Sequence, residues 1–418
     1  MKFEEYPISD GIKKSISKQG FKKPTDIQYK AIPNILRGED VLAIAQTGTG
    51  KTAAFVIPIL HLLHIKKTVR KSKGIKCLVM APTHELALQI HEVFISLAKH
   101  TKVSSSCIHG GVDQDPQKEK LAEGVDVLIA TPGRLFDLVS QGDVKLDKLE
   151  ILVLDEADHM LDLGFIKDIQ DLMRHIPPHR QTLFFSATIT EKIKKLAYSL
   201  VTNPIRIQIS PKDPVAKNIE HALAFIEMED KRYFLGNMLQ EHPERKTLVF
   251  VRTKVRAERL KSALDRQGVE AITIHGDKEQ KQREESMQAF RKGDQKTLIA
   301  TDISARGIDV PNVDFVVNYD LPDSAEQYVH RVGRTGRGRE KGQALSFCAT
   351  EELELLEEID TNLGKPIARM EISKKDYQMT KNSIVEKNED NWQKLLDAAA
   401  IEQKAYEKMK SKRRKGKK

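Results

Sequence analysis

Short apolar runs alternate with amphipathic stretches through the first half of the chain. The apolar runs are residues 41–45, 77–81, 104–108, 125–130, 151–154 and 182–185. Between them, segments such as 85–98 and 166–176 repeat apolar positions at helical spacing. Because the runs are too continuous for a sheet with one face in water, they predict a parallel sheet covered by helices on both faces.

A break in this alternation divides the chain into two similar parts. Residues 210–214 read Ser-Pro-Lys-Asp-Pro, a composition typical of a linker, and apolar runs then resume. The later runs are residues 246–251, 271–274, 297–300, 315–318 and 343–348. The pattern predicts an α/β protein with domains at 1–209 and 218–365, a linker at 210–217 and an extension at 366–418. Ligands of such domains bind at the carboxyl ends of the strands.

A glycine-containing loop follows the first apolar run and precedes a helix-like segment. Gly48 and Gly50 allow backbone N–H groups to approach phosphate oxygens, and the helix N-terminus favours negative charge at the same place. Lys51 is expected to contact the β/γ-phosphates and Thr52 to bind Mg²⁺. The strict phosphate-loop pattern has glycine where Ala45 stands. The residues expected to form the cradle are Ala45, Gln46, Thr47, Gly48, Thr49, Gly50, Lys51 and Thr52.

A strand ending in acids supplies a partner for this loop. The apolar run 151–154 leads directly into Asp155 and Glu156, with Asp158 two residues later. Asp155 at the strand tip is expected to hold Mg²⁺, and Glu156 to orient and deprotonate the attacking water. An acidic helix N-terminus is the alternative reading of these residues. The hydroxyls of Ser186 and Thr188, after another strand, are expected to reach this acidic cluster.

An arginine-rich segment lies in the second half, at residues 330–337. Phosphoryl transfer requires fixed positive charge where the γ-phosphate charge develops, and Arg334 and Arg337 are expected to supply it across a cleft. In that case hydrolysis requires the two domains to close. A basic loop facing solvent or RNA phosphate is the alternative.

Composition and charge narrow the class of protein further. No apolar run is long enough to span a bilayer, and the N-terminus lacks the layout of a signal peptide, so we expect a cytoplasmic protein. Its three cysteines are expected to be buried, reduced thiols. Residues 366–418 hold 15 basic and 8 acidic residues, a net charge of +7, which leaves +2 for the rest. Such a tail favours contact with a polyanion through counterion release.

These motifs together resemble those of DEAD-box RNA helicases, within helicase superfamily 2, and most of all the bacterial RhlE-type branch. The resemblance runs from Phe3 to about Cys348 and covers nearly every family motif in order. It implies two tandem RecA-like domains that bind ATP and Mg²⁺ in the cleft between them. It also implies that Phe3 stacks on the adenine, that Phe21 and Gln28 belong to the adenine-reading motif, and that Asp309 contacts the ribose.

The resemblance assigns further residues to RNA and to coupling. Those matched to motifs that contact RNA are Pro82, Thr83, Gly110, Gly111, Thr131, Pro132, Gly133, Arg134, Arg252, Thr253, Gln280, Arg283, Thr301 and Gly307. Ser186 and Thr188 match the motif that links hydrolysis to strand separation, Asp158 is grouped with them, and His330 matches the residue that bridges to them. The helix at 135–140 is expected to bend the bound strand.

The implied function is an RNA-stimulated ATPase that grips single-stranded RNA without sequence preference and separates short duplexes locally or remodels a ribonucleoprotein, such as the ribosome. Two other functions stay open: a DNA translocase of superfamily 2, and an RNA clamp or scaffold whose grip the nucleotide controls. The physiological RNA, protein partners and oligomeric state are not determined by the sequence.

Three positions depart from the family pattern. His84 and His159 stand where arginine is common, and Ser304 replaces alanine. An imidazole is mostly neutral near pH 7, unlike a guanidinium. The replacement at His84 therefore leaves open whether this position contacts RNA or the other domain.

Overall fold

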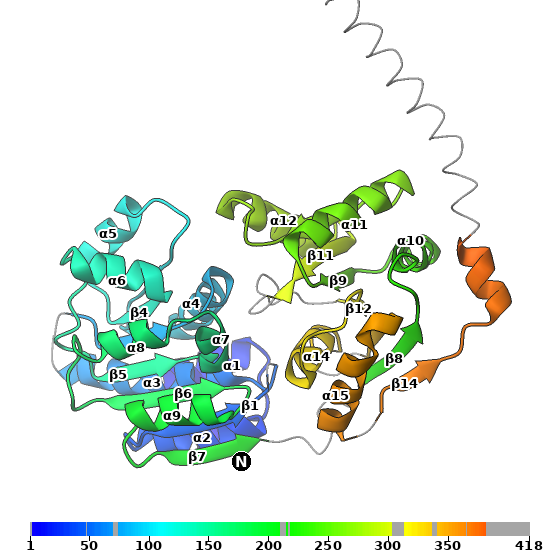
Figure 1. Ribbon diagram of the computed structural model, residues 1–418. Coiled ribbons are helices and arrows are strands. Elements are labelled where there is room, and N and C mark those ends of the chain that lie inside the picture. Colours follow the sequence, from blue (N-terminus) through cyan, green and yellow to red (C-terminus); the bar gives the residue numbers. More distant parts are fainter. Residues whose placement is uncertain are drawn as a thin grey trace, which may run out of the picture.

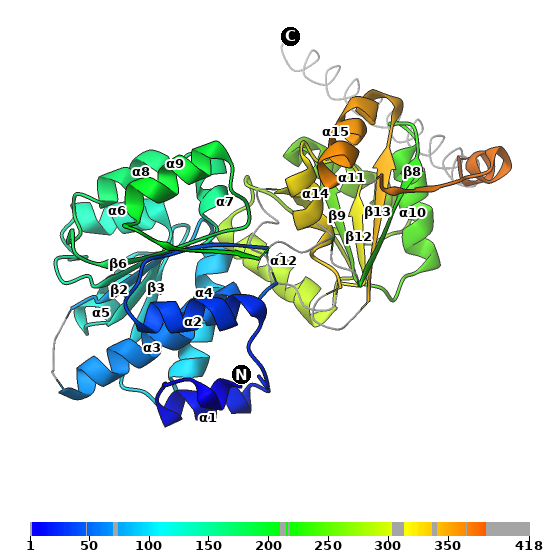
Figure 2. The same cartoon turned by 90° about the horizontal axis from the view of Figure 1, so that it is seen from below.

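The computed structural model describes residues 2–46, 48–69, 74–209, 215, 218–302, 313–336, 341–364 and 366–381. Within these residues the chain forms two parallel sheets, each covered by helices on both faces (Figures 1 and 2). The predicted fold class is therefore confirmed. Most of the predicted linker, residues 210–214 and 216–217, lies outside the described residues.

The first sheet holds seven parallel strands among the described residues, in the order β3-β4-β2-β5-β6-β1-β7. They are β1 (Val41–Ala45), β2 (Cys77–Met80), β3 (Ser105–Ile108), β4 (Val127–Ala130), β5 (Ile151–Leu154), β6 (Gln181–Ser186) and β7 (Ile205–Ile209). Alternate side chains of each strand enter opposite layers of the core, which is why the strands read as continuous apolar runs.

Helices cover both faces of this sheet (Figure 2). One face is covered by α1 (Asp10–Lys18), α2 (Asp26–Leu36), α3 (Lys51–Val69) and α4 (His84–Ala98). The other face is covered by α6 (Pro132–Ser140), α7 (Ala157–Asp162), α8 (Ile166–Leu172) and α9 (Glu191–Leu200). A short 3-10 helix at Phe3–Glu5 precedes α1, and α5 (Asp115–Ala122) packs beside the edge strand β3.

The second sheet repeats the architecture, with seven parallel strands in the order β10-β11-β9-β12-β13-β8-β14 within the described ranges. They are β8 (Ile219–Phe225), β9 (Thr247–Val251), β10 (Ile272–Ile274), β11 (Thr297–Thr301), β12 (Phe315–Asn318), β13 (Gly342–Cys348) and β14 (Ala368–Met370). Its helices are α10 (Lys231–Glu241), α11 (Lys254–Arg266), α12 (Gln280–Lys292), α14 (Ala325–Val332), α15 (Leu353–Leu363) and a 3-10 turn at Thr350–Glu352. One core layer packs on α10 and α11, and the other on α12, α14 and α15.

The sequence pattern located every predicted strand to within about two residues, but it missed three edge or near-edge strands: β7, β8 and β14. The last of these strands lies within the predicted extension, where Ala368 pairs with Ala222 of β8. Beyond β14, the Tyr377 hydroxyl bonds the Asp230 carboxylate at 3.0 Å. The start of the predicted basic extension therefore packs on the second sheet. All residues of β14 are exposed, so they carry no apolar pattern.

Two simpler expectations are also answered. Within the described ranges, no helix combines the length and apolar character needed to cross a membrane. All three cysteines are free thiols, with Cys77 and Cys348 buried and Cys107 partly buried. Burial raises the pKa of the Cys107 thiol to about 12.

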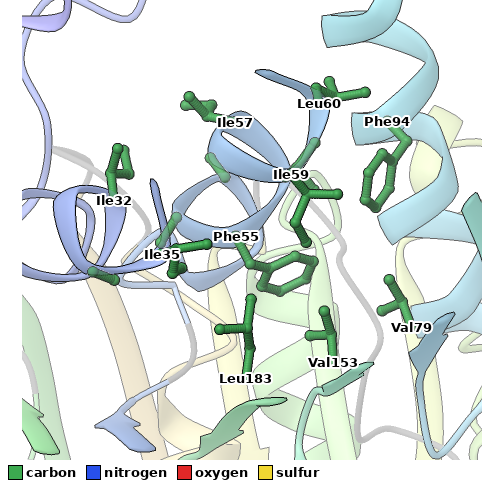
Figure 3. Close-up of a cluster of buried hydrophobic side chains, with 14 of the residues drawn as sticks. Ile32, Ile35, Phe55, Ile57, Ile59, Leu60, Val79, Phe94, Val153 and Leu183 are labelled. Atoms are coloured by element: carbon green, nitrogen blue, oxygen red, sulfur yellow. The ribbon is translucent and has the colours of Figure 1, made fainter. Parts of the chain in front are cut away.

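The phosphate-loop helix α3 is anchored in the first core by Phe55. Its ring points toward Leu183 and Val153 of the sheet, among the apolar side chains of α2 and α4 (Figure 3). The Phe55 and Phe185 ring centroids lie 5.2 Å apart. Because Phe55 lies one turn after Lys51, this packing also fixes the start of the helix.

We predict that Phe55→Ala lowers the free energy of unfolding of the first domain by about 3–5 kcal/mol, because it removes a fully buried ring and leaves a cavity. Urea denaturation measures the change, and hydrogen exchange at the amides of β1 and α3 assigns it to this domain. The matched control is Ile95→Ala on α4, where the side chain is 51% exposed. Equal losses in the two variants would contradict this packing.

Candidate active site between the two domains

The glycine loop after β1 is built to receive an anion. Gly48 and Gly50 have φ angles of 83° and 90°, in the left-handed region that favours glycine. A Cβ on Gly50 would lie only 2.6 Å from Nε2 of Gln28. Lys51 is 6% exposed, and its Nζ makes no hydrogen bond within the described part of the chain. A buried ammonium that has no hydrogen-bond partner among the described residues, at a helix N-terminus, fits a phosphate group.

Gln28 connects the second helix to this loop. Its Oε1 accepts from the Thr25 amide at 3.0 Å, and its Nε2 donates to the Gly50 carbonyl at 3.1 Å. The side chain predicted to read adenine thus lies beside the loop, with its amide engaged by the backbone. The sequence placed Gln28 near the nucleotide only through the family resemblance.

The two aromatic residues predicted near the base differ in exposure. Phe3 is 2% exposed and packs against Tyr6 and Phe21, with ring centroids 6.1 and 6.5 Å away. Phe21 is 40% exposed. The expectation that Phe3 itself stacks on the adenine does not fit this packing. The geometry instead favours Phe21 as the aromatic face that is open to a ligand, with Phe3 supporting it from behind.

Two carboxylates at the end of β5 face the same region. Asp155 is 2% exposed and Glu156 is 8% exposed. Burial raises the pKa of Asp155 to about 7, with Lys51 opposing the shift. Burial also acts to raise the pKa of Glu156. His159, Lys51 and Arg334 outweigh that effect and lower the pKa of Glu156 to about 2. The carboxylate of Asp155 and the hydroxyl of the half-buried Thr52 both supply oxygen donors, which are the ligands that suit Mg²⁺.

Glu156 is held in an uncommon backbone conformation. Its φ and ψ are both 51°, a left-handed conformation that costs a non-glycine residue about 1–3 kcal/mol. Its amide donates to Oδ1 of Asp155 at 3.1 Å. His159 is buried, with Nδ1 3.7 Å from the Glu156 carboxylate. The Glu156 carboxylate lines a cavity described below.

Asp158 links these acids to the end of β6. Its Oδ2 accepts from the amides of Ala187 and Thr188 at 3.0 and 3.1 Å. The Ser186 hydroxyl accepts from the Thr188 amide at 3.4 Å. The expectation that the hydroxyls of Ser186 and Thr188 reach the acids is therefore corrected, because backbone amides make the contact. These amides end the strand and need acceptors there.

The arginines of the 330–337 segment have different surroundings. Arg331 forms a bidentate pair with Asp302 at 2.6 and 2.7 Å and lies over the Phe250 ring, so it stabilises the second domain. Arg334 is 5% exposed and donates from Nε to the His330 carbonyl. Arg337 lies outside the described residues, as do Thr47, Gly307 and Asp309.

A small cavity between the domains brings together three of the predicted catalytic residues, Glu156, His330 and Arg334, whereas Lys51 and Asp155 do not line it. It measures about 60 Å³, room for ordered water, and its walls come from both sheets. The first domain contributes the residues after β5 and β6, and the second contributes α14 and the residues after it. The site residues that line it are Glu156, Asp158, Thr188, His330 and Arg334.

A second bridge between the domains joins α4 to α12. Arg283 Nη2 donates to Glu85 Oε1 at 2.7 Å, with both side chains largely buried. His84 Nδ1 lies 3.2 Å from Gln280 Oε1. Gly111 packs closely against Gln280 at this contact, since a Cβ on Gly111 would lie 3.1 Å from the Gln280 side chain. The side chains of Gln280 and Arg283, predicted to contact RNA, are thus used for contact between domains, and so is His84.

The other residues predicted to bind RNA lie at the carboxyl ends of strands, in the loops that follow them or in the first turn of the next helix. Thr83 caps α4 by accepting from Leu86, and Thr253 caps α11 by accepting from Arg256. Arg134 donates to the Val112 carbonyl at 2.7 Å, while its Nη1 has no partner within the described chain. The remaining residues of this set in the structure are Pro82, Gly110, Thr131, Pro132, Gly133, Arg252 and Thr301.

Comparison with known families agrees with this geometry. A DEAD/DEAH box helicase model matches residues 25–196, and a helicase conserved C-terminal domain model matches residues 230–339. The chain belongs to the DEAD-box helicase family. This helicase is 39% identical over 371 residues to the ATP-dependent RNA helicase RhlB of Shewanella oneidensis, which covers 88% of this chain and 84% of that one.

Other relatives are equally similar. The DEAD-box ATP-dependent RNA helicase RhpA of Helicobacter pylori is 39% identical over 86% of this helicase and 73% of its own length. The ATP-dependent RNA helicase CshA of Listeria monocytogenes is 39% identical over 87% and 69%. The finer resemblance to the RhlE-type branch stays a prediction.

Solved structures agree on the arrangement of the domains. S. cerevisiae Dbp5 bound to RNA and ADP BeF3 matches with a TM-score of 0.80 at 30% identity, covering 92% of this helicase and 99% of that chain. Mss116 bound to ssRNA and UDP-BeF matches at 0.81 and 28%, covering 90% and 81%. A Dbp5 variant bound to Nup159, Gle1, IP6 and ADP matches at only 0.61. The two domains here are thus arranged as in the complexes with RNA and a nucleotide analogue.

Sequence reasoning missed the residues whose role depends on the closed arrangement. Glu85, in the first turn of α4, was not expected to join the domains, yet it is buried against Arg283 of the other domain. Glu326, at the start of α14, lines the cavity between the domains. His159 gave a signal as a departure from the family pattern, but its burial beside Glu156 was visible only in the structure.

We predict that closure of the two domains weakens as pH falls below 6.5, the ordinary pKa of His84. Burial and the cations of His109 and Arg283 lower this pKa, outweighing the opposite effects of Gln280 and Glu85. A depressed histidine pKa means that the contact favours the neutral ring, so its stabilisation is present above pH 6.5 and is lost as the ring protonates.

Fluorescence energy transfer between dyes on α9 and α15, with RNA and an ATP analogue bound, measures closure across this range. The control is His84→Gln, which can still bond Gln280 but does not titrate. The difference between the wild type and this variant isolates His84 from the other acids of the cleft. Identical pH profiles for the two proteins would contradict the assignment.

Proposed function

We propose that this chain is an ATP-dependent RNA helicase that grips single-stranded RNA without sequence preference and separates short duplexes locally. One observation carries the proposal: groups suited to water activation and to charge stabilisation come from different domains and line one cavity. Glu156 belongs to the first domain and Arg334 to the second. The relatives named ATP-dependent RNA helicases and the similar structures bound to RNA support the substrate.

The residues have distinct proposed roles in hydrolysis. Lys51 and the loop amides hold the phosphates, and Thr52 and Asp155 hold Mg²⁺, which when bound neutralises phosphate charge. Glu156 is ionised at neutral pH, so it can orient the attacking water and accept its proton as the bond from the γ-phosphorus to ADP breaks. Arg334 offsets the charge that develops, and Arg337 is proposed as a second such arginine.

Coupling to RNA follows from the same closure. Asp158 ties the acidic turn to the end of β6, and His330 faces the same cavity from α14. The Glu85–Arg283 ion pair joins the two domains on the side of the cleft where the predicted RNA-binding residues lie. Phosphate and 2′-hydroxyl contacts give binding without base preference, and hydrolysis releases the grip. The same proposal includes domain limits at residues 209 and 218 and a basic tail that increases affinity for RNA. It also includes action on a ribonucleoprotein and a cytoplasmic location.

Two other functions are separated by direct tests. A DNA translocase would be stimulated by single-stranded DNA. A clamp or scaffold would bind RNA under nucleotide control without steady hydrolysis.

We predict that single-stranded RNA stimulates ATP hydrolysis and that DNA of the same sequence does not, because a grip on 2′-hydroxyls distinguishes the two. Phosphate release measured with each polymer at saturation tests this. Equal stimulation would favour the translocase, and no stimulation by either would favour the clamp.

We predict that Glu156→Gln lowers kcat roughly 10²–10⁴-fold, because the amide cannot accept the proton, while RNA binding in the presence of ATP is retained. Glutamine keeps the shape of the side chain, so a closed complex with ATP and RNA should accumulate. Single-turnover hydrolysis and RNA-binding assays measure the two effects. Asp162→Asn, six residues further along and lining the same cavity, is the matched control and should turn over normally. Unchanged turnover in Glu156→Gln would remove the role assigned to Glu156.

A further inference from the structure

We propose that the hollow between α10 and α11 of the second domain binds a segment of RNA that extends beyond the cleft. The inference rests on the proposed function and adds a binding surface outside the motif residues already assigned. The hollow measures about 1030 Å³, at the upper end of the size of small-molecule pockets, and it is open to solvent along α11.

Three parts of the second domain form this hollow. The chain before α10 contributes Met228 and Glu229, the first turn of α10 contributes Arg232, and α11 forms one long wall. The chain after β10 and β12 forms the floor, with His275 and Tyr319. The Tyr319 ring is buried, so the floor offers little room for stacking. The walls must therefore account for recognition.

Arginines give the α11 wall its charge. Arg256, Arg259 and Arg266 recur at spacings of three and seven residues, which places them on one face of the helix. Arg232 faces them from α10. Arg256 is paired with Asp320 at 2.8 Å. Arg259 and Arg266 are exposed, and no ion pair involves them within the part of the chain that the structure describes.

Two of the three acidic residues that line the hollow, Glu258 and Asp277, have partners of their own, and Glu229 is exposed without an ion pair within the described residues. Glu258 accepts from His275 at 2.8 Å and lies 3.8 Å from Lys278. Asp277 pairs with Lys254 at 2.5 Å. These local pairs leave the guanidiniums of Arg259 and Arg266 as the charge available to a ligand. A polyanion is the complementary partner.

The hollow continues the predicted RNA surface. Thr253, matched to a motif that contacts RNA, lies on its rim and caps the first turn of α11. Figure 1 shows α11 and α12 on the same upper side of the molecule as α5 and α6 of the first domain. A strand that leaves the cleft past Thr253 therefore meets Arg259 and then Arg266 along the helix.

The chemistry favours nucleic acid over a protein partner. Cores of protein interfaces are depleted in charged residues and enriched in aromatic side chains. Among the residues that line the hollow, the exposed large apolar side chain is Val255, at the N-terminal end of α11. Along the rest of α11, arginines dominate the wall of the hollow. Arg259 and Arg266 are separated by ~10 Å along the helix axis, so they contact different phosphates of one strand. Binding of this kind carries no sequence preference.

The test compares two single-stranded RNAs in the presence of a non-hydrolysable ATP analogue. One fills only the cleft, and the other is longer by several nucleotides at both ends. In the wild type we expect the longer RNA to bind more tightly. In the double variant Arg259→Gln/Arg266→Gln we expect this gain to disappear. We also expect its binding of the longer RNA to be less sensitive to salt. When the salt concentration rises fourfold, the loss of affinity should be roughly sevenfold smaller than in the wild type, because two phosphate contacts are missing.

The short RNA serves as the internal control. We expect the double variant to bind it and to hydrolyse ATP with it as the wild type does, since neither arginine lies in the cleft. Arg174→Gln/Lys195→Gln removes two exposed charges from the first domain and should leave both RNAs unaffected. An unchanged gain from the longer RNA, or equal losses with both RNAs, would overturn the proposal. Failure of the proposed function would appear separately, as absence of short-RNA binding by the wild type.

A second measurement does not depend on removing charge. Ser262 lines the hollow between the two arginines. A photo-crosslinker attached at Ser262→Cys should capture the longer RNA through its terminal nucleotides and should not capture the short one. Capture of neither RNA, or of both, would contradict the path along α11.

Discussion

Opposite charges from two separate domains meet in one small cavity, and the rest of the structure depends on that meeting. Glu156 is buried in the first domain, and Arg334 of the second domain is among the cations that hold its pKa low. Charge interactions are strong where water is excluded, and they weaken steeply when the partners separate. The geometry of the catalytic groups is therefore a property of the closed arrangement and not of either domain alone.

Two physical links make closure sensitive to both ligands. On the nucleotide side, Asp158 fixes the turn after β5 to the end of β6 through backbone amides. On the RNA side, Arg283 reaches across to Glu85, at the base of a helix whose cap is the predicted RNA contact Thr83. A ligand that holds the two domains together on one side of the cleft also favours contact on the other side, because both links join the same two domains.

The second domain positions its part of the interface through a buried ion pair. Lys231 and Glu352 are 0% and 2% exposed, and the Lys231 ammonium also donates to the carbonyls of Tyr319 and Phe347. The other Glu352 oxygen accepts from the Leu321 amide and lies 3.4 Å from Arg252. A buried pair of this kind tolerates the loss of neither partner, since the remaining charge would be left without compensation. It anchors the loop after β12 and, through Arg252, the predicted RNA surface.

The sequence by itself determined the class of fold, the strands that carry the motifs and the chemistry of the phosphate loop. These features are local: an apolar run buried on both faces, a glycine at positive φ and an acid at a strand end can each be recognised within a few residues. Tertiary structure alone decided the rest. It formed β14 from exposed residues by pairing with β8, buried Phe3 behind Phe21, and used Gln280 and Arg283 to join the domains. Those outcomes depend on which surfaces meet after folding, and no local pattern records a contact between residues about two hundred positions apart.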